Sequence, residues 1–162
     1  MKIKYLKVLL ILVFFYASLQ LFLKYYQIGI NQSKSVKGTV FLLNKDVKNI
    51  DNYEYVVLLY DADDYMNYTK GKKFIKKIIC KSGDNLDFLE TKNNYEYFCN
   101  NILIAQAFKR DSKNNPLPHF NFKGTIPKDK YFVIGTHPKS FDSRYWGFVD
   151  REKIIAGATK LW

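Results

Sequence analysis

The chain has 162 residues, of which 26 are lysine or arginine and 15 are aspartate or glutamate, giving a net charge of +11. A chain of this length folds around one core and leaves no room for a second sizeable domain. The charge favours contact with anionic surfaces, either lipid head groups or nucleic acid, and the lack of internal repeats excludes a solenoid.

The first predicted element is a membrane-spanning helix. Residues 8–23 are uncharged and strongly apolar, and with its flanks the segment covers residues 5–26, close to the ~20 residues that a bilayer helix needs. Tyr25 and Tyr26 fit the aromatic belt at a membrane surface. A cleavable signal peptide is the main alternative, but no small-x-small site follows the apolar core. Lysines on the two sides nearly balance, so charge alone does not decide the orientation.

A polar segment follows and leads into a strand. Residues 30–43 read Ile-Asn-Gln-Ser-Lys-Ser-Val-Lys-Gly-Thr-Val-Phe-Leu-Leu, with Asn31, Ser33 and Ser35 at alternate positions. In extended backbone Ser33 and Ser35 would share a face. Taken alone, the segment is best interpreted as a polar linker after the membrane helix.

The remainder of the chain is predicted to be β-rich. Aromatic residues make up 17% of the sequence, in runs with Val and Ile that Gly, Asn, Asp and Pro interrupt. Strands are expected at residues 53–60, within 71–84, and at 86–90, 95–104, 131–134 and 154–162. Residues 105–123 are polar and contain proline, which predicts a long loop or extended insertion.

Within residues 71–84, two adjacent lysines face opposite ways on the predicted strand. Lys76 shares its face with Phe74, Ile78 and Cys80. Lys77 shares its face with Ile75 and Ile79 but also with two lysines, at positions 73 and 81. An apolar face removes water from an ammonium group and lowers its pKa from ~10.4 towards neutrality, as a general base requires. A basic edge strand that discourages aggregation or binds lipid is the alternative for the other lysines.

Residues 131–149 read YFVIGTHPKSFDSRYWGFV, an apolar strand that ends at Gly135 and leads into a polar loop. Asp142 and Arg144 are two residues apart, so in extended backbone they would share a face and form a charge-assisted pair. An isolated Asp-Ser-Arg would be interpreted as a surface salt bridge in a turn. This run is longer and more unusual than that.

Three blocks in this order, behind an apolar anchor, resemble the type I signal peptidases, membrane-anchored serine proteases with a Ser–Lys dyad. The family signature is a Gly, a short polar loop, Ser-x-Asp-Ser-Arg, an aromatic pair and a Gly. The matching residues are Gly135, Ser140, Asp142, Ser143, Arg144, Tyr145, Trp146 and Gly147. The usual Gly-Asp-Asn is replaced by Gly135-Thr136-His137, with a shorter gap to Ser140. This shorter form resembles the conjugative-transfer (TraF-type) branch, as does the Asn-x-Ser-x-Ser spacing that ends at Ser35.

The resemblance implies a mainly β fold, with a signal-peptidase-like antiparallel β catalytic domain and one N-terminal transmembrane helix. Residues 1–27 would form the cytoplasmic N-terminus and the anchor, and residues 28–162 the extracytoplasmic serine protease domain. The implied site residues are Ser35 as nucleophile, Lys76 as general base, Ser33 in the oxyanion hole, Ser140 orienting the base, and Asp142 with Arg144 as a structural pair. The proline that the family often has near its nucleophile is absent, and Lys37-Gly38 follows Val36 instead.

Relatives of the conjugative branch carry a cysteine in each of the two regions that hold Cys80 and Cys99, which implies a disulfide in an exported domain. Two free buried thiols are the open alternative. A metal site is not expected, because His119 and His137 lie far from each other and from the cysteines. The acidic run at residues 61–64 lacks the glycine and distant glutamate of a calcium loop and is interpreted as a solvated turn. No cofactor is implied.

By resemblance, the chain is a serine endopeptidase of the bacterial inner membrane, single-pass, with its catalytic domain on the periplasmic side. Its expected substrates are exported precursors with leader or signal peptides, pilin or other conjugative-transfer proteins among them. Expected partners are membrane lipid and other components of a conjugative transfer or type IV secretion system.

Three alternatives stay open. The first is a general housekeeping signal peptidase, and the second is a catalytically silent, membrane-anchored scaffold of a secretion apparatus. The third is a membrane-tethered nucleic-acid binder. Specific nucleic-acid binding is not expected, because most aromatic residues alternate as core positions and do not interleave with lysines on a surface.

Overall fold

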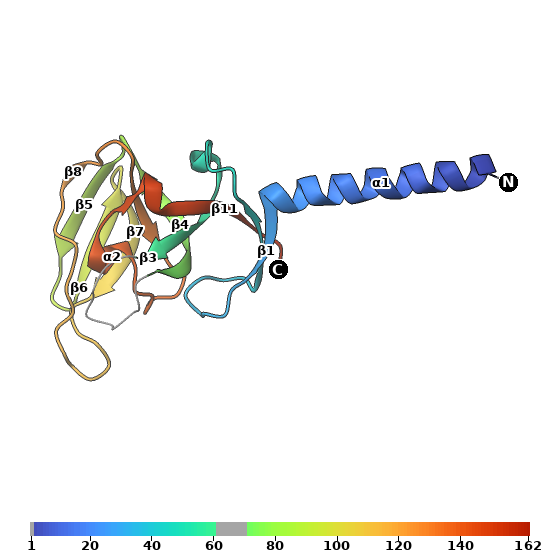
Figure 1. The fold of residues 1–162 in the computed structure, drawn as a ribbon. Coiled ribbons are helices and arrows are strands. Elements are labelled where there is room, and N and C mark those ends of the chain that lie inside the picture. The colour runs from blue at the N-terminus through green and yellow to red at the C-terminus, as the bar shows by residue number, and fades with distance from the viewer. Residues whose placement is uncertain (1, 61–70) are drawn as a thin grey trace.

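The computed structural model describes residues 2–60 and 71–162, and its first element is a long helix that extends away from the β domain (Figure 1). Helix α1 spans Lys2–Tyr25. Its segment Lys4–Tyr25 has a mean hydropathy of 2.2 and no burial against the domain. By length and composition, this segment can cross a bilayer, in agreement with the span predicted from the sequence.

Strand β1 (Tyr26–Ile30) begins at the residue that follows α1 and was not predicted. It pairs antiparallel with β2 (Val40–Asn44), with Tyr26 opposite Asn44 and Ile30 opposite Val40. Residues 31–39 between these strands form a loop with turns, so the expectation of extended backbone at the serines is wrong. The polar linker is therefore the connection of a hairpin whose first strand continues directly from the helix.

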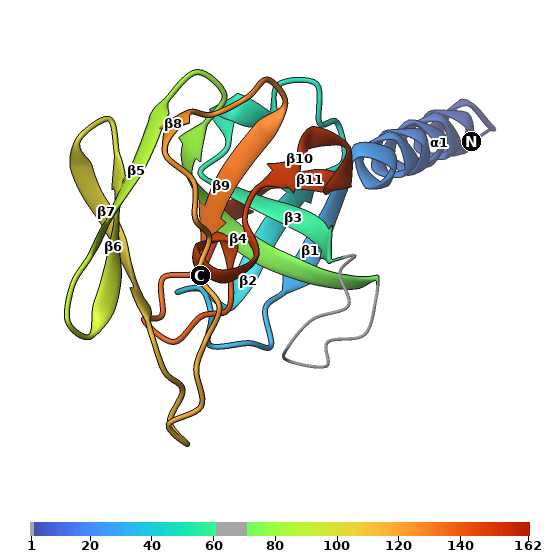
Figure 2. The same cartoon turned by 90° about the vertical axis from the view of Figure 1, so that its left-hand side faces the viewer.

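The domain contains two antiparallel sheets, which confirms the mainly β fold class (Figure 2). The larger sheet has the order β1-β2-β11-β3-β4-β9-β10. Its remaining strands are β3 (Tyr55–Tyr60), β4 (Lys72–Lys81), β9 (Lys130–Ile134), β10 (Val149–Asp150) and β11 (Ile154–Lys160). The smaller sheet has the order β7-β6-β5-β8, with β5 (Asn85–Glu90), β6 (Asn94–Cys99), β7 (Ile102–Phe108) and β8 (Gly124–Thr125).

Strand β4 lies between β3 and β9, but β9 pairs only with its second half, from Lys77 to Lys81. The interpretation as a basic edge strand is therefore wrong for Lys77, whereas Lys72 and Lys73 lie on a stretch that, among the described residues, pairs with β3 alone. In the register, Lys76 is opposite Val56 of β3, and Lys77 is opposite Ile134 of β9. Successive side chains of a strand point to opposite faces of the sheet, so Lys76 and Lys77 face opposite ways, and Lys76 is the buried one of the two.

The two sheets are joined covalently by a disulfide between Cys80 of β4 and Cys99 of β6. The bond lies in an apolar cluster in which Leu86, Tyr97 and Phe132 are fully buried. It links residues 19 apart in the sequence, and closing a loop of this size stabilises the fold by about 3 kcal/mol in the chain-entropy account.

Two further sequence expectations differ from the structure. The predicted loop over residues 105–123 begins later, because β7 continues to Phe108. The Asp-Ser-Arg run is not extended: Ser143–Trp146 forms a short helix, α2, and Asp142 caps it by accepting the N–H of Arg144. An aspartate at this position satisfies an amide that the helix leaves without a partner, which favours the turn over a strand. Single helical turns are also found at Ile50–Asn52 (η1) and Arg151–Lys153 (η2).

Candidate active site

The loop after β1 brings two serine hydroxyls together. Ser33 Oγ and Ser35 Oγ lie 2.7 Å apart, at hydrogen-bond distance. The side chain of Asn31 shapes the loop: its Nδ2 donates to the carbonyls of Val36 at 3.1 Å and Gly38 at 3.0 Å. Its Oδ1 accepts from both the N–H and the hydroxyl of Ser33. The two serines therefore meet through a turn held by an asparagine and not along one face of a strand.

Lys76 is the buried lysine of β4. It is 2% exposed, and its Nζ donates a 2.7 Å hydrogen bond to Ser140 Oγ. Burial lowers the pKa of Lys76 to about 8, an effect that the Asp142 carboxylate opposes and the Arg144 guanidinium reinforces. An amine with this pKa is neutral in a useful fraction of molecules near neutral pH, so it can accept a proton.

Lys77, the next residue, lies in a different environment. Its Nζ lies 2.8 Å from Glu54 Oε1 in an ion pair, and both side chains are partly exposed. The hydrogen bond with Glu54 raises the pKa of Lys77 above its ordinary value, so this lysine stays charged. Strand alternation thus separates the two lysines as the sequence predicted.

Gly135 lies at the point where three parts of the site meet. A Cβ at this position would lie 2.1 Å from Ser140 Oγ and 2.4 Å from the carbonyl oxygen of Ser35, closer than real side chains approach. The N–H of Gly135 donates to Asp142 Oδ2 at 2.8 Å. Only glycine allows this contact between the loop that carries Ser140 and the loop that carries Ser35.

Two further hydrogen bonds hold these loops against each other. The N–H of His137 donates to the carbonyl of Ser35 at 3.1 Å. The N–H of Lys37 donates to Thr136 Oγ1 at 2.7 Å. The backbone on both sides of Val36 is therefore fixed by the short Gly-Thr-His loop, the part of the signature that departs from the usual family pattern.

Arg144 holds the loop from its other side. Its Nε and Nη2 each lie 2.7 Å from a different oxygen of Asp142, in a two-pronged ion pair. Its remaining donors reach the carbonyls of Gln106 at 2.6 Å, Pro138 at 3.2 Å and Ser140 at 2.9 Å. Burial disfavours the charge on Arg144, but the bonds from Asp142 outweigh it and raise the pKa of Arg144. These bonds fix Asp142 and Arg144 relative to the backbone at Gln106, Pro138 and Ser140.

Four of the predicted site residues, Ser33, Ser35, Lys76 and Ser140, line one cavity of about 300 Å³, and Asp142 and Arg144 are not part of its lining. It is lined by Ser33, Lys34, Ser35, Phe74, Lys76, His137, Lys139, Ser140 and Phe141. Inside it, Ser35 Oγ is paired with Ser33 Oγ, and Lys76 Nζ is paired with Ser140 Oγ. Among the described residues no hydrogen bond joins Ser35 Oγ to Lys76 Nζ, so a direct proton transfer requires these two groups to approach each other. A serine hydroxyl beside a neutral amine is suited to nucleophilic attack on a carbonyl carbon.

Some residues that shape the site were given no role from the sequence. Asn31 had a local signal, since asparagine two residues before a serine favours an Asx turn. Thr136 and His137 act across about a hundred residues, Lys37 and Thr136 being 99 apart, so no local pattern announces them. Ser143 Oγ accepts the N–H of Val133 at 3.0 Å and ties α2 to β9.

A metal is not favoured by the described residues. Across residues 2–60 and 71–162, the group with suitable spacing is Cys80, Asp84 and Cys99. Both sulfurs belong to the disulfide, so they offer no thiolate to an ion. The acidic run at residues 61–64 lies outside the described residues.

Comparison with known proteins identifies relatives of one kind. The family model described as "Signal peptidase, peptidase S26" matches residues 2–162. Over 116 residues the chain is 34% identical to signal peptidase I of Buchnera aphidicola subsp. Schizaphis graminum, a match that covers 60% of this chain and 36% of that protein. Over 66 residues it is 36% identical to signal peptidase I of Haemophilus influenzae, covering 38% of this chain and 19% of that protein.

These matches span well under half the length of the curated relatives. A solved structure, a signal peptidase I from Enterococcus faecalis V583, is 20% identical in sequence and superposes with a TM-score of 0.40, covering 66% of this chain and 94% of that one.

Proposed function

This chain belongs to the signal peptidase family of S26 peptidases, and we propose that it is a membrane-anchored serine endopeptidase that cleaves leader peptides from exported precursors. One observation carries the proposal: a serine hydroxyl and a lysine amine line the same cavity, and burial lowers the pKa of that lysine to about 8. A protein without this chemistry has no physical need for a buried amine beside a hydroxyl, which is the argument against a silent scaffold.

In the proposed reaction, Ser35 Oγ turns towards neutral Lys76 Nζ and gives up its proton as it attacks the scissile carbonyl carbon. The developing oxyanion accepts hydrogen bonds from the N–H of Ser35 and the hydroxyl of Ser33. Lys76, now an ammonium, donates a proton to the leaving amine, and the peptide bond breaks to leave an acyl-serine. Water then loses a proton to Lys76 and attacks the carbonyl carbon of the ester. The bond between that carbon and Ser35 Oγ breaks, and Lys76 returns the proton to Ser35 Oγ.

The neighbouring residues have positioning roles in this scheme. Ser140 accepts the hydrogen bond of Lys76 Nζ and directs the amine into the cavity, an assignment supported by their 2.7 Å separation. Asp142 and Arg144 keep the loop that carries Ser140 in place. Both are buried and fully hydrogen-bonded to each other, as a rigid support requires.

The proposed topology has residues 1–27 as the cytoplasmic end and anchor and residues 28–162 as a domain on the periplasmic side of a bacterial inner membrane. The apolar helix Lys4–Tyr25 supports the anchor. The disulfide between Cys80 and Cys99 supports an exported domain, because such bonds form and persist in oxidising compartments.

As a finer assignment we propose the conjugative-transfer branch, with pilin or other transfer-system precursors as substrates and components of that system as partners. The supporting observation is the short loop with Thr136 and His137, which contacts the backbone around Ser35 while Asn31 shapes the other side. A general signal peptidase is the second candidate, favoured by the relatives, which are themselves named signal peptidase I.

The test is processing in membranes of the full-length chain co-expressed with two sets of precursors, pilin-type and general secreted proteins. Ser35→Ala and Lys76→Ala should abolish cleavage, and Ser33→Ala should slow it by roughly 10²–10³-fold, the cost of one oxyanion donor. Cleavage at the wild-type rate by Ser35→Ala and Lys76→Ala would contradict the dyad. Cleavage of general precursors with no preference for the pilin set would contradict the conjugative branch alone.

A further inference from the structure

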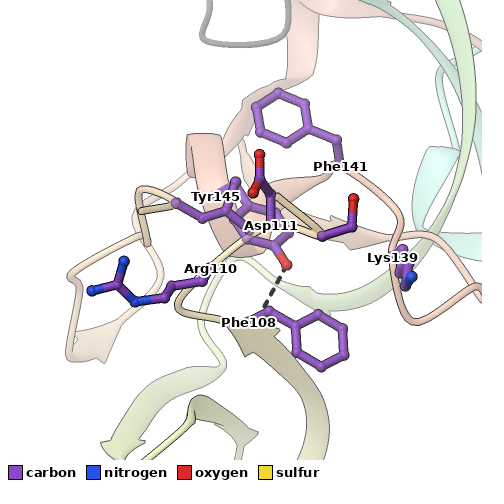
Figure 3. A pocket seen from close by; sticks show the side chains of 8 residues that line it. Phe108, Arg110, Asp111, Lys139, Phe141 and Tyr145 are labelled. Carbon is purple, nitrogen blue, oxygen red and sulfur yellow. Dashed lines mark hydrogen bonds between the residues drawn. The ribbon is translucent and has the colours of Figure 1, made fainter. Parts of the chain in front are cut away.

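A second cavity of about 300 Å³ lies beside the one that holds the serine and lysine, and none of the proposed roles uses it. Figure 3 shows the Phe141 and Phe108 rings on opposite sides of it, with Tyr145 between them. Leu117 completes the apolar lining. The hydroxyl of Tyr145 accepts the N–H of Phe108 at 3.2 Å, which fixes the end of β7 against α2. We call this space the aromatic cavity.

The aromatic cavity adjoins the catalytic cavity. Lys139 and Phe141 line both, so one continuous surface leads from Ser35 past the Phe141 ring into the aromatic cavity. On the other side of the catalytic cavity is a third hollow, lined by residues 30–33 and 72–75, which shares Ser33 and Phe74 with it. Three hollows therefore adjoin in series, with the serine and lysine in the middle one, as an extended substrate chain requires.

The position of α1 gives this series a direction. The third hollow includes Ile30 of β1, and β1 starts at the residue after α1. The aromatic cavity is formed by α2 and the end of β7, on the part of the domain far from α1 (Figure 1). The apolar leader of a precursor lies in the same membrane as the anchor, so its half of the substrate reaches Ser35 from the β1 side. The other half must leave towards the aromatic cavity.

We propose that the aromatic cavity binds the substrate chain on the carboxyl side of the scissile bond, and that it takes an apolar or aromatic side chain from the first few residues of the released protein. This inference rests on the proposed peptidase function and adds to it a determinant of specificity on the leaving side.

Two charged residues of the lining, Arg110 and Asp111, have hydrogen-bond partners in their own loop. Arg110 Nη1 donates to the carbonyl of Asn114, and its side chain extends away from the three rings (Figure 3). The carboxylate of Asp111 accepts the N–H groups of Lys113 and Asn115. These two side chains bond within their own loop, and the rest of the lining is dominated by apolar groups: Leu117, Phe108 and the stacked rings of Phe141 and Tyr145. Such a lining favours an apolar or aromatic ligand group.

Lys139 adds a second constraint. It lies at the border of the two cavities, and its side chain is exposed. An ammonium group there repels a lysine or arginine on the substrate, so basic residues immediately after the scissile bond should be cut poorly.

The first test uses the full-length chain in detergent micelles and quenched fluorescent peptides with Ala-x-Ala before the bond, following the small residues of leader cleavage sites. One peptide carries phenylalanine at the second to fourth positions after the bond, and its matched partner carries serine there. Phe108→Ala and Leu117→Ala should lower kcat/KM for the phenylalanine peptide by roughly 10-fold and leave the serine peptide unchanged. Ile102→Ala, at the exposed other end of β7, is the matched control and should alter neither.

Equal kcat/KM for the two peptides in the wild type and both variants would overturn the inference while leaving the peptidase function intact. A loss that is the same for both peptides would also overturn it, because a site that binds the phenylalanine side chain must distinguish the two peptides. The unchanged serine peptide is the internal check that each variant is folded.

The second test does not depend on cleavage. Ser35→Ala protein is irradiated with the same peptide, with benzoylphenylalanine placed at single positions before or after the bond. Crosslinks to Phe108 or Leu117 should come from positions after the bond only. Crosslinks to these residues from positions before the bond, or from none, would overturn the inference. Crosslinks from after the bond, combined with no cleavage by the wild type, would support the binding site and contradict the peptidase function.

Discussion

Two buried cations near the catalytic cavity, Lys76 and Arg144, differ in how their charge is compensated. Lys76 is 2% exposed and Arg144 is 3% exposed, so both charges are shielded from water to a similar extent. Arg144 has a carboxylate in two-pronged contact and three carbonyl partners. Lys76 has one hydrogen bond, to the neutral hydroxyl of Ser140. The pKa of Arg144 is raised and that of Lys76 is lowered to about 8.

The difference shows that burial alone does not determine what a cation does. Where a carboxylate compensates the lost hydration, the charge becomes permanent and the residue acts as a fixed support. Where only a hydroxyl does so, the proton is held weakly and the residue can exchange it. Ser140 contacts both cations, since its hydroxyl accepts from Lys76 and its carbonyl accepts from Arg144. In the proposed mechanism Arg144 provides a fixed support and Lys76 transfers the proton.

The largest effect is expected when Lys76, the lysine with the lowered pKa, is replaced. Lys76→Met keeps the length of the side chain but cannot take a proton, so cleavage should fall by at least ~10³-fold. Stability should change the other way. The folded-state pKa lies below the ordinary 10.5, so the penalty of the buried ammonium is present in full below pH 8 and disappears above pH 10.5.

The free energy of unfolding of Lys76→Met at pH 7 should therefore exceed that of the wild type by up to about 3 kcal/mol. Denaturant unfolding in micelles at pH 7 and pH 10.5 measures this gain and its disappearance. An inactive variant with reduced stability at pH 7 would contradict the account of Lys76 as a destabilised cation.

Removing the permanent charge should have the opposite consequence for stability. Arg144→Met leaves the fully buried carboxylate of Asp142 without its counter-charge, and we expect a loss of about 3–5 kcal/mol in unfolding free energy. Arg110→Met is the matched control, because Arg110 is exposed and bonds one carbonyl of its own loop; it should cost under about 1 kcal/mol. Similar losses for the two variants would mean that the ion pair is not a support.

The contact between the two regions can be tested at Gly135. Gly135→Ala places a methyl group 2.4 Å from the carbonyl oxygen of Ser35, so the two loops must move apart. A displacement of this size in a catalytic centre costs about 100-fold in kcat. Gly29→Ala is the control, since its added methyl meets the mobile end of the Leu43 side chain and should have little effect on kcat. Wild-type rates for Gly135→Ala would contradict the close packing of the loops.

The smallest expected effect is in the pH dependence of kcat/KM, which tests whether Lys76 is the group that titrates. Because the base must be neutral, kcat/KM should fall about 10-fold per pH unit below about pH 8 and level off above it. Lys77→Met should show the same profile, because Lys77 pairs with Glu54 and remains charged. A wild-type profile that is flat between pH 6 and 9 would exclude Lys76 as the titrating base.

Local patterns were sufficient to predict the apolar helix, most of the strands and the burial of Lys76, since each depends on a short periodicity that survives in the fold. The turn at Asp142 was mistaken for extended backbone because spacing of two fits a strand, whereas the capping bond to Arg144 favours a helix. Strand β1 was missed because five residues directly after a membrane helix have no boundary signal of their own.

The partners of the site residues lie far from them in the sequence, so local patterns do not reveal them. Ser140 is 64 residues from Lys76, so their hydrogen bond was accessible only through a family resemblance. The aromatic cavity combines the end of β7, the loop at Leu117 and α2, and no sequence pattern shows that these segments surround an empty space.

The direct continuation of α1 into β1 has a geometric consequence. Ser35 lies nine residues after Tyr26, so it is held within roughly 30 Å of the end of the helix. The pairing of β1 with β2 holds residues 26–30 of this connection in a strand, which limits how far Ser35 can move relative to the helix. In the proposed topology the active site would therefore be held at a fixed distance from the membrane surface. It would select scissile bonds by their distance from the apolar segment of the precursor, before any side chain is recognised.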